Sequence, residues 1–221
     1  MKLLNELGIE PKNENLYKRA FTHTSYANEE NTESYERLEY LGDAVLELIM
    51  SDYLYRNTEY DEGKMTKLRS HYVCESALYE YSLRLHLNQE LRLGHGEAEN
   101  GGMYRKAIVA DIFEAFIGAM FLDQGLEYVK KFMYKHIIPI IENREIDFIE
   151  DYKSVLQELV QTDKRSLQYV VIQEEGPAHN KTFTVEVRID DIRYGVGTAH
   201  SKKEAEQEAA RDALKKAQNG I

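Results

Sequence analysis

The chain has 221 residues, of which 43% are hydrophobic, enough for one large domain or two smaller domains with a true core. No apolar run approaches the roughly 18 residues that a membrane-spanning helix requires, and charges interrupt the apolar part of the N-terminus, so the sequence predicts neither a membrane segment nor a signal peptide. The single cysteine, Cys74, excludes an internal disulfide and favours a cytoplasmic location.

The net charge of −11 by itself argues against nucleic acid as a partner. The charge is uneven, however, because residues 151–221 contain 12 acidic and 11 basic side chains, whereas residues 1–150 contain 27 acidic and 17 basic ones. The acidity therefore belongs to the first part of the chain. The second part is close to neutral and can still gather its basic side chains on one surface.

Residues 1–142 are predicted to be mostly helical, because apolar side chains recur at intervals of three and four residues and strand-like alternation is absent. Within this part, the glycine-rich segment 94–104 is predicted to be a flexible polar loop. The charged segment 142–151 is only weakly periodic, and we take it as the linker to a second domain.

The pattern changes after residue 151 and predicts the order α-β-β-β-α, one helical layer on a three-stranded antiparallel sheet. The central strand alternates cleanly, with Val185 and Val187 on one face and Glu186 on the other. Asp190 and Asp191 are predicted to form a tight turn into the third strand. The predicted elements are a helix at 151–161, strands at 167–175, 181–189 and 192–199, and a helix at 201–217.

The stretch YERLEYLGDAVLELIM, residues 35–50, places acidic and apolar side chains on opposite sides of a helix. Like charges three and four residues apart destabilise a helix by roughly 0.2–0.5 kcal/mol per pair, so the clustering of acids on one side of this helix requires an explanation. A solvated outer face is one interpretation, and a site for a cation is the other. The acidic residues are Glu36, Glu39, Asp43 and Glu47, and the apolar ones are Leu38, Leu41, Val45, Leu48 and Ile49.

A second acidic pair, Asp111 and Glu114, lies in the segment 108–122, which is apolar on nearly all sides and is predicted to be a buried helix. Its small neighbours on the same face, Ala115 and Gly118, leave room for another element to approach. Buried carboxylates need compensation, because an unpaired one is very costly. One interpretation is an ion pair within the protein, for which the candidate cations are Lys64, Lys67, Arg69 and Lys106.

The other interpretation brings the two acidic pairs together. If their faces pack on each other, four carboxylates meet, and each pair about 4 Å apart repels by ~4 kcal/mol at an effective dielectric near 20. Such a cluster persists when it is protonated or when it surrounds hard divalent cations, and oxygen-only ligands favour Mg²⁺ or Mn²⁺ over zinc. Because Mg²⁺ commonly binds phosphate oxygens as well, the arrangement points to metal-assisted phosphodiester hydrolysis.

The closing helix carries basic residues at its start. Ser201 and Glu204 fit a capping box that makes Ser201 the N-cap, so Lys202 and Lys203 lie in the first turn. Cations there cost roughly 0.3–1 kcal/mol each against the helix dipole. A bound phosphate would explain them, and two solvated lysines are the alternative. The alanines at 205, 209 and 213 are predicted to pack closely on the sheet.

The first helix of the second part presents hydrogen-bonding side chains on one face, which suits ribose hydroxyls and base edges in the shallow minor groove of an RNA duplex. A solvated face could look the same. The turn at Gly176 and Pro177 presents a second group of polar side chains. The first helix, this turn and the lysines at the start of the closing helix make three contact regions, which fit two minor grooves and the phosphates between them. The helix residues are Ser154, Gln157, Glu158 and Gln161, and the turn residues are His179, Asn180 and Lys181.

Several sequence blocks, in their order, resemble one known family. ERLEYLGDAVL closely resembles the signature of bacterial ribonuclease III, and FTHTSYANE (21–29) and DIFEAFIGAMFLDQG (111–125) resemble its other catalytic blocks. Residues 151–217 resemble its double-stranded-RNA-binding domain. The resemblance implies an all-α endonuclease domain at 1–145, a linker at 146–150 and a small α+β (α-β-β-β-α) double-stranded-RNA-binding domain at 151–219.

The resemblance implies a homodimer with one active site per subunit, each cutting one strand of double-stranded RNA. It implies that Asp43 and Glu114 are catalytic and that the cofactor is Mg²⁺, for which Mn²⁺ can substitute. His23 has no partner in the sequence for work as a general base and is predicted to be structural. Tyr40 stands where the family often has Phe, at a position implied to pack across the dimer interface. The implied metal ligands are Glu39, Asp43, Asp111 and Glu114, and the implied supporting acids are Glu36 and Glu62.

The implied products have 5′-phosphate and 3′-hydroxyl ends with a short 3′ overhang, and the implied substrates are structured precursors of ribosomal, messenger and transfer RNA. Neither a membrane nor a small-molecule substrate is expected. One alternative is a non-catalytic double-stranded-RNA-binding protein with a degenerate nuclease domain, which the complete set of four acids argues against. Another is a helical phosphohydrolase for small phosphate esters, which does not account for the C-terminal α-β-β-β-α segment.

Overall fold

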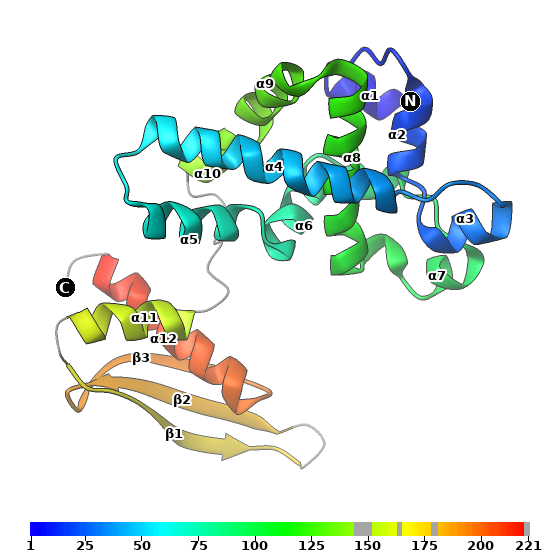
Figure 1. Cartoon of the computed structure of the whole chain (residues 1–221). Helices are drawn as coiled ribbons and strands as arrows, with labels where there is room; N and C mark the ends of the chain where they lie inside the picture. The colour runs from blue at the N-terminus through cyan, green and yellow to red at the C-terminus, as the bar shows by residue number, and fades with distance from the viewer. Residues whose placement is uncertain (144–151, 163–164, 178–180, 219–221) are drawn as a thin grey trace. The chain divides into compact units, whose positions relative to one another are not determined.

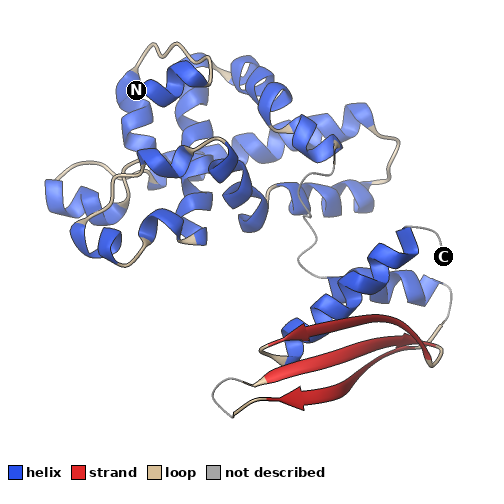
Figure 2. Ribbon diagram, turned by 180° about the vertical axis from the view of Figure 1, so that it is seen from behind, coloured by secondary structure: helices blue, strands red, loops and turns tan. Residues whose placement is uncertain are grey.

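The first part of the chain is helical, and the second is a three-stranded sheet with two helices, as the sequence predicts (Figure 1 and Figure 2). The computed structural model describes residues 1–143, 152–162, 165–177 and 181–218. The chain divides into two compact units, residues 1–148 (unit 1) and residues 149–221 (unit 2). The predicted linker at 146–150 lies outside the described residues.

Unit 1 is built around helix α8, Lys106–Gln124, which packs against α2, α4, α6 and α9 and carries buried residues on nearly every side, as predicted. Although α8 is strongly apolar, no helix in the described part of the chain has the length and hydropathy to cross a membrane. The other elements are α1 (Lys2–Glu6), α2 (Glu14–Ala20), α3 (Thr24–Glu30), α4 (Glu36–Asn57), α5 (Glu62–Tyr72), α6 (Glu75–Arg84), η1 (Leu87–Glu90), α7 (His95–Glu99), η2 (Gly102–Tyr104), α9 (Leu126–His136) and α10 (Ile138–Glu142).

Helices α4 and α8 cross in backbone contact because each has a glycine at the crossing (Figure 1). A Cβ atom at Gly42 would lie 1.8 Å from the carbonyl oxygen of Glu114, and a Cβ atom at Gly118 would lie 2.1 Å from the carbonyl oxygen of Leu38. No side chain fits in either place, since protein interiors are close-packed. The room that Ala115 and Gly118 were predicted to leave on α8 is therefore filled by α4.

The Asp123 carboxylate at the end of α8 anchors the N-terminal segment. It accepts hydrogen bonds from the backbone N–H groups of Lys12 (3.1 Å) and Asn13 (2.7 Å) and from the hydroxyl of Tyr17 (3.1 Å). A buried carboxylate is tolerated when donors satisfy its oxygens in this way. Asp123 is therefore a structural acid, unlike the acids near the crossing of α4 and α8.

Two local predictions for unit 1 are wrong. The segment 94–104 is not an open loop, because it contains α7 and η2, and the Glu29 carboxylate accepts the His95 backbone N–H (2.9 Å) at the start of α7. Leu48 was predicted to join the buried arc of α4 and is instead 54% exposed. The buried side of α4 is turned from the predicted arc, because Leu46, Met50 and Leu54 are buried beside Val45 and Ile49 whereas Leu48 lies outside this side.

Unit 2 has the strand order β1-β2-β3, with both neighbouring pairs antiparallel. Val185 and Val187 are buried with the alanines of α12, as the alternation of β2 predicts. Asp190 and Asp191 both have positive φ angles (49° and 63°), which confirms the tight hairpin turn. The elements are α11 (Tyr152–Thr162), β1 (Leu167–Glu175), β2 (Thr182–Ile189), β3 (Ile192–Ala199) and α12 (Lys202–Gln218).

Two glycines of β3 let α12 lie directly on the sheet. A Cβ atom at Gly195 would lie 2.3 Å from the carbonyl oxygen of Ala209, and one at Gly197 would lie 2.2 Å from the backbone nitrogen of Ala209. Ala205, Ala209 and Ala213 are all buried against the sheet, so the close packing predicted for the alanine stripe is confirmed.

Substituting the crossing glycine should destabilise unit 1. We expect Gly42→Ala to lower the free energy of unfolding by about 2 kcal/mol or more, because the methyl group forces α4 from α8 and alanine's better helix propensity offsets at most about 1 kcal/mol. Gly96→Ala is the control, because a Cβ atom there meets nothing within 4 Å. Urea denaturation of both variants measures the difference, and a Gly42→Ala protein as stable as the parent would contradict the crossing.

Candidate active site

Four carboxylates gather where α4 crosses α8. Glu39 and Asp43 lie on either side of Gly42 in α4, and Asp111 and Glu114 lie in α8 before Gly118. Because both backbones touch at the glycines, the acidic faces of the two helices meet there, as the second interpretation of the sequence predicts. Each acid is close enough to act electrostatically on at least one acid of the other helix.

The pKa values of the two glutamates report this crowding. The pKa of Glu114 is raised to about 8, first by burial and then by the carboxylates of Asp43, Glu39 and Asp111 in that order. Burial also raises the pKa of Glu39 to about 7, with Asp111 as the next cause. A charge that is partly removed from water and faces like charges favours its neutral form. In the absence of a cation, the cluster therefore binds protons near neutral pH.

Burial also raises the pKa of Asp111, and the hydroxyl of Tyr35 opposes that rise by donating a hydrogen bond to Oδ2 (3.1 Å). The charge of Glu75 raises the pKa of Asp111, whereas His23 lowers it. Sequence reasoning missed both Tyr35 and Glu75 as neighbours of this site. Tyr35 directly precedes α4, but Glu75 comes from α6, and no spacing along the chain could have connected it to Asp111.

The ion pairs offered as an alternative are not found in the described part of the chain. The Lys64 ammonium lies over the ring of Tyr60, 3.4 Å from its centroid, and the Arg69 guanidinium donates to the hydroxyl of Ser51 (3.0 Å). The Lys106 ammonium donates to the hydroxyl of Ser76 (2.5 Å). Neither Asp111 nor Glu114 has an ion pair with a described residue, so no described cation of the protein neutralises these two acids.

The donor set fits a hard divalent cation. All four groups are carboxylates, and oxygen donors are the ligands that Mg²⁺ and Mn²⁺ prefer. As the described residues are placed, no group of three or more His, Cys, Asp or Glu side chains could hold a metal ion. The four acids therefore act on one another electrostatically without forming a closed metal cage.

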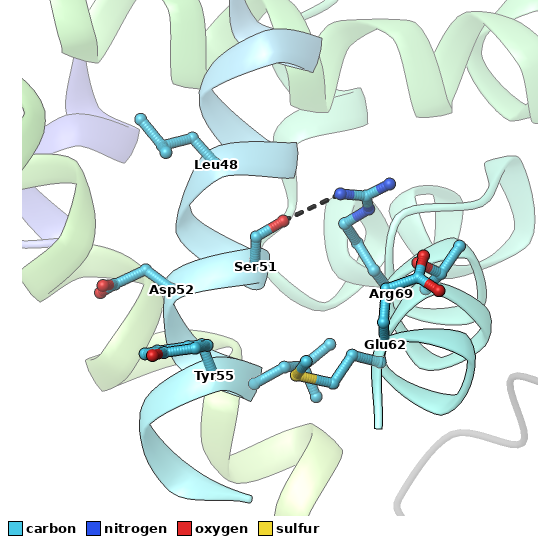
Figure 3. Close-up of a pocket in the computed structure, with 9 residues that line it drawn as sticks. Leu48, Ser51, Asp52, Tyr55, Glu62 and Arg69 are labelled. Carbon is cyan, nitrogen blue, oxygen red and sulfur yellow. Dashed lines mark hydrogen bonds between the residues drawn. The ribbon is translucent and has the colours of Figure 1, made fainter. Parts of the chain in front are cut away.

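The two supporting acids have different positions. Glu36 is exposed, accepts a hydrogen bond from the Ser34 hydroxyl (2.9 Å) and acts electrostatically on Glu39, so it borders the cluster. Glu62 instead lines a separate cavity of about 410 Å³ between α4 and α5, which Figure 3 shows together with Arg69. This cavity lies against the later turns of α4, so the structure does not bring Glu62 to the four acids within this chain.

His23 has the structural role that the sequence predicts. Its Nδ1 atom accepts the backbone N–H of Ser25 (3.1 Å) and so caps the N-terminus of α3. Its ring packs against that of Tyr35, with centroids 5.8 Å apart. A ring held in this way is a poor candidate for a mobile general base.

Two basic residues of unit 2, Lys181 and Lys202, form a cluster with one acid, Glu174. Lys202, in the first turn of α12, pairs with Oε1 of Glu174 (2.8 Å), and Lys181 pairs with Oε2 (2.5 Å). Both ammonium groups lie over the ring of Phe183. The two lysines hold the pKa of Glu174 down to about 2. Lys202 and Lys203 are both exposed at the start of α12, and Lys202 in addition pairs with Glu174.

The other predicted contact residues of unit 2 are placed as follows. The hydroxyl of Ser201 accepts the backbone N–H of Glu204 (3.2 Å), which confirms Ser201 as the N-cap of α12. Ser154, Gln157 and Gln161 are exposed on α11. Glu158 belongs to α11, but its side chain lies outside the described part of the structure, as do His179 and Asn180 entirely.

Comparison with known proteins decides the family. A ribonuclease-III-like family model matches residues 13–141, and the double-stranded RNA binding motif matches residues 152–217. A protein named ribonuclease 3 from Oceanobacillus iheyensis is 49% identical over 96% of this chain and 95% of its own length. The chain belongs to the ribonuclease III family. This confirms the resemblance and the fold class inferred from the sequence.

Other members of the ribonuclease III family support the same assignment. Ribonuclease 3 from Geobacillus kaustophilus is 47% identical over 96% of this chain and 89% of its own length. The solved nuclease domain of ribonuclease III from Campylobacter jejuni is 34% identical, covers 66% of this chain and 97% of that chain, and superposes with a TM-score of 0.57. Unit 1 is therefore a ribonuclease III nuclease domain.

The raised pKa values predict how stability depends on pH without metal. The folded protein holds the Glu114 proton more tightly than the unfolded chain does, so this stabilisation is complete at acidic pH and is lost as pH rises through about 8. We expect the melting temperature in EDTA to fall between about pH 5 and about pH 8.5, and to fall less for Glu114→Gln. Thermal melts of both proteins across this range test the idea, and parallel pH profiles would refute it.

Proposed function

We propose that this protein is an endonuclease that hydrolyses double-stranded RNA with Mg²⁺, for which Mn²⁺ can substitute, held by Glu39, Asp43, Asp111 and Glu114. The observation that supports this most is the meeting of four carboxylates from two helices, with no ion pair to a described residue at either Asp111 or Glu114. A protein that only binds RNA has no need of such a destabilising cluster.

Each group has a proposed part in the reaction. Glu39, Asp43, Asp111 and Glu114 would hold a divalent cation, which would supply an attacking water of lowered pKa and would stabilise charge on the phosphate and on the leaving 3′-oxygen. Asp43 and Glu114 are the proposed catalytic residues, and Glu39 and Asp111 complete the ligand set. Because Glu114 has a pKa of about 8 in the absence of a cation, cation and proton compete for it, and activity should rise with pH.

Unit 2 is the proposed source of RNA affinity. Its contacts would come from the exposed face of α11, the turn after β1 and the start of α12, which together suit two minor grooves and the phosphates between them. We propose domain limits of 1–145 and 151–219 with a linker at 146–150. The proposed RNA contacts are Ser154, Gln157, Glu158 and Gln161 on α11, His179, Asn180 and Lys181 in the turn, and Ser201, Lys202 and Lys203 on α12.

We also propose a homodimer, so that two active sites cut the two strands. Along one side of α4, Tyr40 is 84% exposed, Leu48 54% and Tyr55 76%, an apolar stripe that suits a second copy. A similar solved structure from Campylobacter jejuni is described as showing flexibility in a region involved in dimer formation of its nuclease domain. The supporting role of Glu62 is then proposed for the dimer rather than for the single chain.

The products would carry 5′-phosphate and 3′-hydroxyl ends with a short 3′ overhang, and the substrates would be structured precursors of ribosomal, messenger and transfer RNA in the cytoplasm. The direct test is incubation of the protein with a long, perfect RNA duplex in Mg²⁺ and in EDTA. Discrete short duplexes that appear only with Mg²⁺ are expected. Intact duplex under both conditions would leave an RNA-binding protein without nuclease activity.

Removing one charge from the cluster should separate cleavage from binding. We expect Glu114→Gln to abolish cleavage at millimolar Mg²⁺ and to leave duplex RNA affinity within about twofold, because glutamine keeps the size of the side chain but is a weaker metal ligand. Metal-free stability should rise or stay level, since one repelling charge is gone. Exposed Glu127→Gln on α9 is the charge-matched control and should cut normally.

A large drop in the metal-free melting temperature of Glu114→Gln would contradict the metal site. A structural ion pair broken in this way costs about 3–5 kcal/mol, because its partner is left buried and uncompensated. Wild-type cleavage by this variant would equally contradict the proposed ligand set.

Phosphate binding at the start of α12 can be measured by salt dependence. We expect Lys202→Ala/Lys203→Ala to weaken duplex RNA binding and to reduce the slope of log affinity against log salt by roughly 0.9 for each phosphate that is no longer neutralised, on the calibration for duplex DNA. Lys215→Ala/Lys216→Ala removes the same charge from the last turn of the same helix and is the control. Equal slopes for the two double variants would refute a specific phosphate site at Lys202 and Lys203.

A further inference from the structure

Tyr35 connects the two helices that carry the four acids. It is only 3% exposed and precedes α4 as its N-cap residue. Its carbonyl oxygen accepts the backbone N–H groups of Leu38 (2.8 Å) and Glu39 (3.0 Å) in the first turn of α4. Its hydroxyl donates across to Oδ2 of Asp111 on α8, 3.1 Å away. One residue thus fixes both the start of the helix that bears Glu39 and one oxygen of Asp111.

The position of the Tyr35 side chain is itself fixed. The backbone N–H of Tyr35 donates to the carbonyl oxygen of Thr22 (2.9 Å), which ties it to the segment before α3. Its ring packs against the ring of His23, and His23 is held in turn as the N-cap of α3. Because the backbone and the ring are both held, the hydroxyl presents its proton to Asp111 from one direction.

We propose that Tyr35 is a positioning residue that orients the Asp111 carboxylate, holding Oδ2 so that Oδ1 is left for a divalent cation. This inference rests on the proposed role of Asp111 as a metal ligand. Within the described residues, the Tyr35 hydroxyl is the one group that hydrogen-bonds the Asp111 side chain. Carboxylates that bind metals are commonly held by such a second group, and its loss typically costs about 10–100-fold in metal affinity.

The chain contains a matched pair for comparison. Tyr17 donates to Oδ2 of Asp123, also over 3.1 Å, and Asp123 belongs to α8 as Asp111 does. Both tyrosines are buried. Asp123 differs because two backbone N–H groups also hold it, and it stands at the far end of α8 from the four acids. Tyr17→Phe therefore removes an equivalent hydrogen bond without touching the proposed ligand set.

The experiment measures Mn²⁺ binding to the full chain by calorimetry, without RNA, for the parent, Tyr35→Phe, Tyr17→Phe and Asp111→Asn. We expect Tyr35→Phe to bind Mn²⁺ about tenfold more weakly or worse, and Tyr17→Phe to bind it as the parent does. In the Asp111→Asn background, Tyr35→Phe should have no further effect, because the oriented group is gone. A Tyr35→Phe protein that binds Mn²⁺ like the parent, or an equal loss in Tyr17→Phe, would overturn the proposal.

A different result would contradict the proposed function. If Asp111→Asn binds Mn²⁺ as tightly as the parent, Asp111 is not a metal ligand. A second measurement applies even if Tyr35→Phe is less stable. The rise in melting temperature on adding Mn²⁺ reports binding to whatever folded protein is present. We expect this rise to shrink in Tyr35→Phe and to stay the same in Tyr17→Phe, and an undiminished rise in Tyr35→Phe would also overturn the proposal.

Discussion

The backbone contact between Gly42 and Gly118 is the constraint on which the nuclease unit depends. Helices whose contact residues carry side chains pack about 8–10 Å apart, and a glycine on each side removes what would hold them at that distance. Glu39 and Asp43 flank Gly42, and Glu114 lies one turn before Gly118, so the contact that joins the helices also forces the carboxylates together. The carboxylates cannot move apart unless the backbone contact between α4 and α8 is lost.

This forced proximity makes the site responsive to its surroundings. No described cation of the protein pairs with Asp111 or Glu114, and protons or metal ions from solution can relieve the repulsion. Glu39 and Glu114 have pKa values of about 7 and about 8, so the two relieving species compete near neutral pH. Stability, metal binding and cleavage are therefore linked through the same carboxylates, and a change in one should be visible in the others. A conventional acidic surface would show no such linkage.

Sequence periodicity predicts the helices, strands and turns that depend on neighbouring residues in the chain. It does not predict features that depend on contacts between residues far apart in the chain. The helical pattern, the alternation of β2 and the turn at Asp190 all follow from local sequence, and Gly118 could be recognised as a place of close approach. The other glycine of the contact, Gly42, could not be recognised from the sequence. A side chain is excluded there by the carbonyl oxygen of Glu114, which belongs to a distant helix. Tyr35 and Glu75 were missed for the same reason. Leu48 was misplaced because the local pattern does not show which side of α4 its neighbours cover, and that side includes Leu46 and Met50 instead.

Clustered charges are arranged differently in the two units. This difference explains how a chain with a net charge of −11 can have nucleic acid as a partner. In unit 1, acids crowd together with no basic partner at Asp111 or Glu114 among the described residues. In unit 2, Lys181 and Lys202 crowd together around Glu174, which supplies the compensating charge from within the protein. Each lysine ammonium has three N–H donors and uses one on Glu174, so a phosphate can be added without breaking the pair. A local arrangement of a few side chains, rather than the total charge, therefore governs whether an acidic protein can bind RNA.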